Sequence, residues 1–166
     1  MNMHEIMSAL SAFFPPSAVS WRCGAVTGSQ GKALAYIDAR DVMARFDGVM
    51  GIDWQVEYTP MPDGTKCCRI GLFINGEWRW RSNGAGDTSV EADKGSYSDA
   101  FKRAAVLWGV GRYLYDLPSP WVEIKPGKNG KGGFITDAAL RDLADRLDRW
   151  HAQQKRKSGR HLEVAS

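Results

Sequence analysis

The stretch from Lys94 to Tyr115 constrains the fold of this chain more than any other part of the sequence. Its apolar residues recur at the i, i+3, i+4, i+7 spacing of a helix that buries one face, namely Phe101, Ala104, Ala105 and Trp108. Ser96 or Ser98 can cap the start of this helix, and Gly109 is placed to end it. The sequence therefore predicts one short amphipathic helix with small residues on its buried face.

Two adjacent basic residues lie on this helix, outside the centre of its buried stripe. At about 100° per residue, Lys102 falls at the edge of the stripe and Arg103 nearly opposite to it. Both side chains can therefore reach solvent or an anionic ligand. An ordinary solvated face, in which Asp99 and Arg103 form an i, i+4 ion pair, is the alternative.

Three strand-like segments precede this helix. Trp54–Tyr58 alternates in polarity, and a second strand from Cys67 to Ile74 meets Trp78–Arg81 across Asn75-Gly76, a strong two-residue hairpin signal. We expect an α+β fold in which a three-stranded antiparallel β-meander packs on the central helix as a β-β-β-α core, with further helices at the N-terminal and C-terminal sides.

The hairpin has two mixed faces. A tight turn at Asn75-Gly76 places the aromatic residues on one face and the arginines on the other, with the cross-strand pairs Phe73 with Trp78, Gly71 with Trp80, Leu72 with Arg79 and Ile70 with Arg81. Either the tryptophans form the core and the arginines sit on a partly covered edge, or Trp78 and Trp80 pack against a neighbouring subunit. Base stacking would require exposed rings.

The flanking segments carry further element signals. An amphipathic helix over Met1–Phe14 ends at Pro15-Pro16, and a second helix opens near Asp38, buries three apolar side chains and ends near Gly48. Those three side chains are Val42, Met43 and Phe46. A polar stretch over residues 24–31 leads to a strand over residues 32–37, and residues 121–125 form another strand. Thr136 caps a final helix whose apolar face contains Leu140, Leu143, Leu147 and Trp150.

Length and charge limit the organisation. A chain of 166 residues with 43% hydrophobic content can bury one full-sized core, so we expect one domain over residues 1–150 and a basic, disordered tail over residues 151–166. The net charge is only +3, but residues 94–131 contain seven basic and three acidic residues. The positive excess is thus local, as a phosphate-binding surface requires.

Enzymatic signatures are weak. The three cysteines indicate inert thiols in a reducing compartment, namely Cys23, Cys67 and Cys68. The histidines lack the spacing of metal ligands. No signal peptide or membrane span is evident, so we expect a cytoplasmic protein without a cofactor or metal. Asp116 with Glu123 and Lys125 loosely matches the metal-holding set of nucleases, which makes a metal-dependent nuclease the leading enzymatic alternative.

Two motifs carry a family resemblance. Residues 98–105 read SDAFKRAA and residues 109–115 read GVGRYLY, while YIDARDV at residues 36–42 and FDGVMGIDW at residues 46–54 precede them in order. Over Ala33 to Leu117, the chain resembles the Rad-fifty-two/Rad-twenty-two family of single-strand annealing proteins, including its bacteriophage members. The resemblance implies a ring-forming, non-enzymatic protein that binds single-stranded DNA and anneals complementary strands without ATP in recombination and double-strand break repair.

The resemblance also implies which residues contact DNA. Lys102 and Arg103 match basic residues of the family's inner groove, Lys94 matches a basic residue just upstream, and Arg40 falls within a register step of another. Val106 and Ile52 depart from the pattern, and four further residues can compensate, namely Lys32, Arg79, Arg81 and Arg112. Single-stranded DNA, further copies of the chain, and a recombinase or single-strand-binding protein are the expected partners. A module that coats single strands or loads a recombinase without annealing is the alternative from another class.

Overall fold

The computed structural model of this protein describes residues 1–62, 65–85, 93–127 and 132–164, and it leaves the side chains of residues 85, 93–94 and 158–164 undescribed. The chain divides into two compact units. The first combines Met1–Ala12 with Ile37–Asp116, and the second combines Phe13–Tyr36 with Leu117–Ser166. The described residues contain both helices and antiparallel sheets, which confirms the predicted mixed α+β class.

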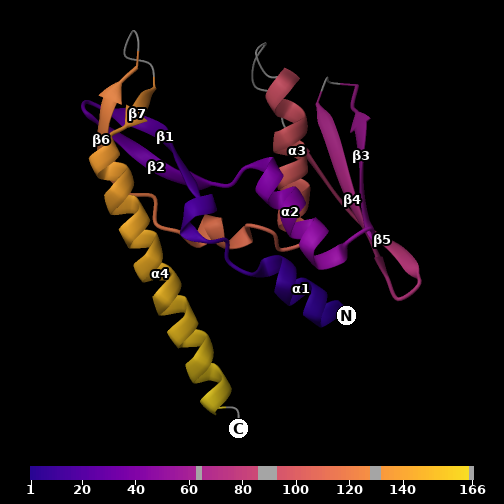
Figure 1. The fold of residues 1–166 in the computed structure, drawn as a ribbon. Helices are drawn as coiled ribbons and strands as arrows, with labels where there is room; N and C mark the ends of the chain where they lie inside the picture. The colour runs from indigo at the N-terminus through magenta and orange to yellow at the C-terminus, as the bar shows by residue number, and fades with distance from the viewer. Residues whose placement is uncertain (63–64, 86–92, 128–131, 165–166) are drawn as a thin grey trace. The chain divides into compact units, whose positions relative to one another are not determined.

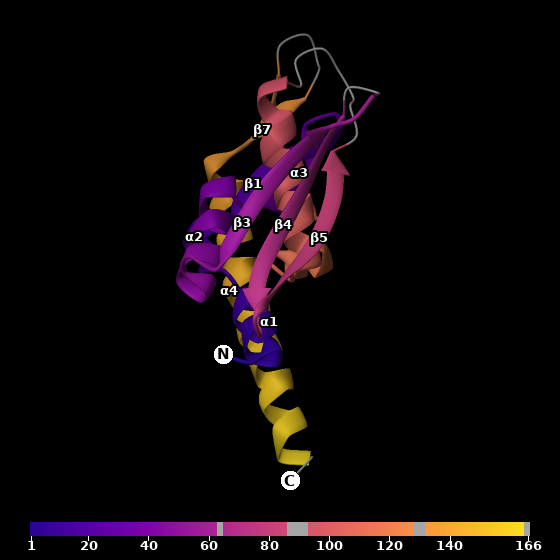
Figure 2. The same ribbon diagram turned by 90° about the vertical axis from the view of Figure 1, so that its right-hand side faces the viewer.

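The first unit contains a three-stranded antiparallel sheet in the order β3-β4-β5. Its elements, in chain order, are α1 (Met3–Ser11), α2 (Ala39–Met50), β3 (Trp54–Pro60), β4 (Lys66–Ile74), β5 (Glu77–Ala85), α3 (Asp93–Leu107) and the 3₁₀ helix η2 (Arg112–Asp116). Figures 1 and 2 show α2 and α3 on the same side of this sheet. The opposite face of the sheet therefore carries no helix of this unit among the described residues.

The hairpin between β4 and β5 has the register that the sequence predicts. Asn75 and Gly76 both have positive φ, 55° and 84°, as a type I′ turn requires. Phe73 pairs with Trp78, and Gly71 pairs with Trp80. Because side chains alternate along a strand, this register fixes which residues share a face.

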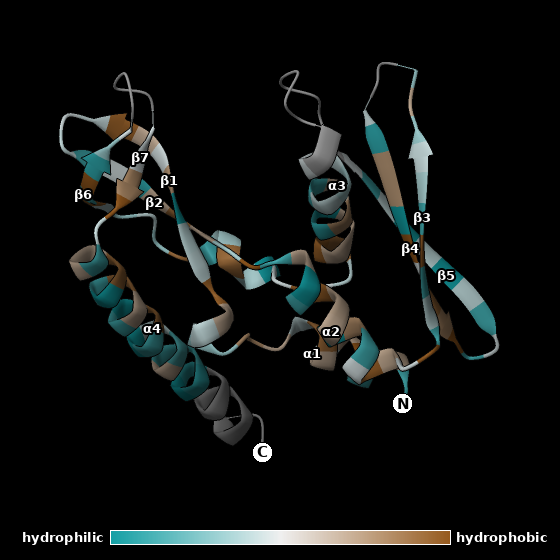
Figure 3. Ribbon diagram, turned by 45° about the horizontal axis from the view of Figure 1, so that its top comes forward, coloured by the Kyte–Doolittle hydropathy of each residue, from teal (hydrophilic) through white to brown (hydrophobic). Residues whose placement is uncertain are grey.

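The core face of this hairpin is the aliphatic one, so of the two alternatives for the tryptophans, the one in which they form the core is wrong. Ile70 and Leu72 are fully buried, whereas Trp78 is 41% exposed. Figure 3 shows hydrophobic, brown segments on β4 between hydrophilic, teal ones. The aliphatic face is the buried one because α3 packs against it. Arg81 lies on the same face, where the Leu107 carbonyl and the Trp108 ring stabilise its charge.

Helix α2 buries Val42 and Phe46, as predicted, but Met43 is 40% exposed. The helix also runs past Gly48 to Met50 and ends at Gly51, whose φ of 59° is open to glycine. Phe46 stacks on Trp54 with ring centroids 5.1 Å apart. This contact ties α2 to the first strand of the sheet.

Helix α3 begins at Asp93, so Ser96 and Ser98 lie within it and do not cap it. Gly95 disfavours a helix by about 1 kcal/mol, so the sequence alone favours a helix that begins after this residue. The predicted end is confirmed: the amide of Gly109 donates to the Val106 carbonyl, and the next amide donates five residues back, as in a Schellman motif.

The second unit contains a sheet in the order β1-β2-β6-β7. Its elements are the 3₁₀ helix η1 (Pro16–Ala18), β1 (Ser20–Thr27), β2 (Gln30–Tyr36), β6 (Trp121–Pro126), β7 (Gly133–Ile135) and α4 (Asp137–Val164). The predicted strands over residues 32–37 and 121–125 are confirmed. The sequence did not predict β1, and its last four residues fall in the polar stretch expected over residues 24–31. The signal for β1 is Gly28-Ser29, a two-residue turn between alternating segments.

Helix α4 follows the predicted pattern at its start. Thr136 accepts a hydrogen bond from the Ala139 amide at 3.3 Å, so it caps the helix as expected. Leu143 and Leu147 are buried on the predicted face. The sequence predicted that the folded domain ends at residue 150, but the helix continues past Trp150 to Val164. His151 in this part of the helix is 8% exposed. The basic residues after Trp150 therefore stand on a helix.

Candidate nucleic-acid interface

Helix α3 stands directly on the sheet of the first unit. Ala100, Ala104 and Ala105 are fully buried, and such small side chains allow a helix backbone to approach its neighbours closely. Trp108 anchors the carboxyl-terminal end, because its Nε1 donates to the Ile70 carbonyl at 3.1 Å in the buried core. The remaining face of α3 is left for charged side chains.

Lys102 and Arg103 occupy that remaining face, as the sequence predicts. Lys102 is partly buried and Arg103 is exposed. Nε of Arg103 donates to Asp99 at 2.8 Å, and the two side chains are 50% and 47% exposed. This hydrogen bond, together with the charge of Asp99, raises the pKa of Arg103 above its ordinary value. The pair is solvated and leaves the remaining guanidinium nitrogens of Arg103 available to a phosphate.

Arg81 and Arg112 have structural contacts at the carboxyl-terminal end of α3. Arg81 donates to the Leu107 carbonyl and lies over the Trp108 ring, 4.3 Å from its centroid. Arg112 donates to the Val106 carbonyl from Nε at 3.0 Å and to the Leu107 carbonyl from Nη2 at 2.9 Å. Cations at this position satisfy the last carbonyls of the helix and oppose the negative end of its dipole.

The other predicted DNA contacts are dispersed. Arg79 pairs with Glu77 at the turn end of β5, and Arg40 is exposed on the first turn of α2 without a hydrogen bond or ion pair to the described residues. Lys94 lies in the first turn of α3, and its side chain is outside the described set. Lys32 is exposed on β2, in the other unit. The first unit thus brings Lys102 and Arg103 together on one helix and holds Arg40 on its neighbour.

The sequence did not identify an aromatic cluster beside the amino-terminal half of α3. Tyr58 and Tyr97 meet edge to face with centroids 5.1 Å apart, and Nζ of Lys66 lies 5.5 Å from the Tyr97 centroid. The tyrosines are 39% and 45% exposed. Half-exposed rings beside a cation can accept a nucleic-acid base by stacking. No local sequence pattern connects these two tyrosines, because they lie on elements that are far apart in the chain.

Arg45, a basic residue of α2 outside the predicted site, caps the carboxyl-terminal end of α1. Nη1 of Arg45 donates to the carbonyls of Ala9, Leu10 and Ala12, the last at 2.6 Å. Burial lowers its pKa from the ordinary value, although the group remains charged. Arg45 is therefore a capping residue and not a surface cation.

Within the described ranges, no group of three or more His, Cys, Asp or Glu side chains is placed to hold a metal ion. Burial raises the pKa of the Cys68 thiol to about 11, so this cysteine is inert at neutral pH. None of the helices formed by described residues combines the length and apolar character of a bilayer crossing.

The sequence of this chain is similar to one protein family and to two named proteins. A profile described as the Rad52/22 family double-strand break repair protein matches residues 2–131. The chain is 39% identical over 126 residues to the single-stranded DNA-binding protein DdrA of Deinococcus deserti, covering 74% of this chain and 62% of that protein. It is 36% identical over 133 residues to DdrA of Deinococcus radiodurans, covering 78% and 64%. The chain thus spans less than two thirds of these relatives, and no solved structure matches it.

Proposed function

Because this chain belongs to the Rad52/22 family, whose profile covers residues 2–131, we propose that it binds single-stranded DNA and anneals complementary strands without ATP. The names of its Deinococcus relatives support the first part of this proposal. The observation that carries it is the setting of Lys102 and Arg103, adjacent cations on a helix whose opposite face is fixed to a sheet.

Annealing requires a particular mode of binding. Contacts to phosphates hold a strand in place without reading its sequence, and they leave the pairing edges of the bases accessible to a second strand. Cations on the outer face of a rigid helix suit this task, because they meet the backbone without enclosing the bases. Tyr58 and Tyr97 add a stacking surface that keeps a strand extended.

We further propose that copies of the chain assemble into a ring through the outer face of the β3-β4-β5 sheet. Phe73 is 39% exposed and Trp78 is 41% exposed, and their centroids lie 5.4 Å apart. Trp80 continues this aromatic row on the same face, 6.0 Å from Trp78. A contiguous exposed aromatic patch is typical of an interaction surface. Within this proposal, residues 1–150 hold both DNA binding and assembly.

The test is an annealing assay with two complementary strands that carry a fluorescent donor and acceptor, run in a chelator and without ATP. We expect the protein to accelerate pairing above the spontaneous rate. A protein that only coats single strands, or loads a recombinase, would slow pairing while still binding each strand. Cleavage of a labelled strand in magnesium would favour the nuclease alternative and contradict the proposal of a non-enzymatic protein.

Assembly is tested separately by light scattering with and without DNA. We expect a large oligomer for the unchanged chain and smaller species for Trp78→Ser with Phe73→Ser. Arg79→Ser on the opposite face of β5 is the matched control, and it should leave assembly unchanged. A monomer at all micromolar concentrations would contradict the ring but not the binding of single strands.

A further inference from the structure

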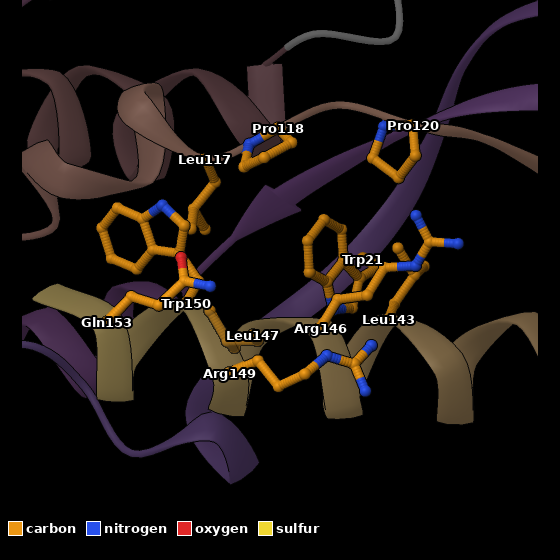
Figure 4. Close-up of a pocket in the computed structure, with 10 residues that line it drawn as sticks. All are labelled: Trp21, Leu117, Pro118, Pro120, Leu143, Arg146, Leu147, Arg149, Trp150 and Gln153. Carbon is orange, nitrogen blue, oxygen red and sulfur yellow. The ribbon is translucent and has the colours of Figure 1, made fainter.

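The second unit contains a pocket that the DNA-binding surface does not use. It has a volume of about 260 Å³ and lies between α4 and the segment that leads into β6. Trp21 and Trp150 stand at separate positions around it, and Leu147 lies between them (Figure 4). Leu117, Pro118, Pro120 and Leu143 complete its apolar lining.

The pocket is pre-organised at one wall. The Trp150 ring packs against Phe13 with centroids 5.3 Å apart, and Phe13 stacks on His151 at 4.9 Å. A ring held on its outer side by other rings does not need to be ordered when a ligand enters, which lowers the entropy cost of binding.

The charged groups of the lining are all positive. Arg146 and Arg149 border the pocket, whereas the aspartates of the same helix segment do not line it. Arg146 already pairs with Asp142 at 2.6 Å. Arg149 makes no hydrogen bond or ion pair with the part of the chain that the structure describes, and it is exposed. Arg149 is therefore the stronger candidate to receive a carboxylate from outside.

The size and polarity of the pocket limit which ligands it can bind. Sites for small molecules have volumes of roughly 300–1,000 Å³, so this pocket suits one or two large side chains better than a cofactor. The arginines and the two indoles of the lining are hydrogen-bond donors, and the Gln153 amide oxygen is its one side-chain acceptor, so the donor groups of a nucleotide base would be buried here with few partners. An aromatic side chain has no such edges, and carboxylates beside it would meet the arginines.

We propose that this pocket binds an acidic peptide segment of a partner protein, with one aromatic side chain inserted between Trp21 and Trp150 and neighbouring carboxylates paired with Arg149 and Arg146. The inference goes beyond the proposed annealing function and concerns a different unit of the chain. It assigns to this surface the recruitment of a protein partner, which the DNA-binding residues do not explain.

The test is fluorescence anisotropy of a labelled peptide that has a central phenylalanine between two runs of aspartate, titrated with the full chain without DNA. We expect saturable binding that weakens as salt is added. A peptide with alanine in place of phenylalanine, and one with asparagine in place of aspartate, should each bind about tenfold or more weakly. Equal binding of either control peptide would overturn the proposal.

Variants of the protein locate the site. Arg149→Glu and Gln153→Glu should each weaken peptide binding about tenfold, because both place a negative charge at the pocket. Arg141→Glu is the matched control: it makes the same charge change on an exposed position of α4 that does not line the pocket. Equal weakening by Arg141→Glu, or none by Arg149→Glu, would refute the assignment.

The same variants separate this inference from the proposed function. Arg149→Glu should leave binding of a thymidine oligonucleotide unchanged. If Arg149→Glu abolished oligonucleotide binding and the acidic peptide did not bind at all, the pocket would be a nucleic-acid site and the peptide proposal would be wrong. If the peptide binds as expected while annealing fails, the partner site stands without the annealing function.

Discussion

The joint replacement of Lys102 and Arg103 by alanine tests the proposed DNA contact most directly. If each side chain holds one phosphate, the double variant should reduce the salt slope of single-strand binding by about 1.4, which is about 0.7 for each lost contact. The same counterion release corresponds to about 25-fold weaker binding at roughly 0.1 M salt, converging with the unchanged protein near 1 M. The loss should be the same for every sequence, because phosphate contacts do not read bases.

The stability cost of this double variant should be small. The ion pair of Arg103 and Asp99 is half exposed on both sides, and exposed i, i+4 pairs contribute about 0.3–0.5 kcal/mol. Neither basic side chain belongs to the buried stripe that holds α3 on the sheet. Urea unfolding should therefore change by at most about 0.5 kcal/mol.

A matched control exists in α4. Arg146 pairs with Asp142 at 2.6 Å with side chains 54% and 48% exposed, nearly the same setting as that of Arg103. Arg146→Ala should cost a similar small stability and leave oligonucleotide binding unchanged. Fluorescence anisotropy with a labelled thymidine oligonucleotide, repeated over a salt series, measures both quantities. A folded, assembled double variant with unchanged affinity and salt slope would refute the contact that we assign to α3.

Three further predictions concern stability and are checked by urea unfolding. Arg81→Ala should cost about 2 kcal/mol, because it removes both a charged hydrogen bond to the end of α3 and the contact with the Trp108 ring, whereas a change within about 0.5 kcal/mol, the cost of an exposed pair, would contradict that role. Gly109→Ala should cost at least about 1 kcal/mol, since φ is 92° and the new Cβ would clash with Oγ of Ser11; Ser11→Gly should recover part of the loss, and no recovery would leave backbone strain as the whole cause. Burial lowers the pKa of His151 in the folded state, so its contribution to stability is complete above about pH 6.5 and is lost as the pH falls through the lower, folded pKa. His151→Phe should lose less stability between neutral pH and pH 5 than the unchanged chain, and identical pH profiles would contradict this assignment.

The local features of this protein could be predicted from its sequence. The helix at Lys102, its termination at Gly109, the Asn75-Gly76 turn and the cap at Thr136 all depend on residues within a few positions of one another. Spacing, turn chemistry and capping act over that range, so each is visible in one chain without a structure. The adjacent cations of α3 could be found for the same reason, since the period of a helix assigns their face.

The tertiary structure decided what the mixed faces do. The hairpin register was predictable, but the choice between its aromatic face and its aliphatic face depended on α3, which lies about thirty residues further along the chain. Arg81 could be recognised as a partner of the α3 carbonyls only when β5 and α3 were brought together. The same holds for Tyr58 beside Tyr97, and for the arginines at the pocket of the second unit. The sequence of a strand allows a polar or aromatic side chain on either face of the sheet. The role of that side chain is therefore set by the distant group that completes its hydrogen bonds or buries it.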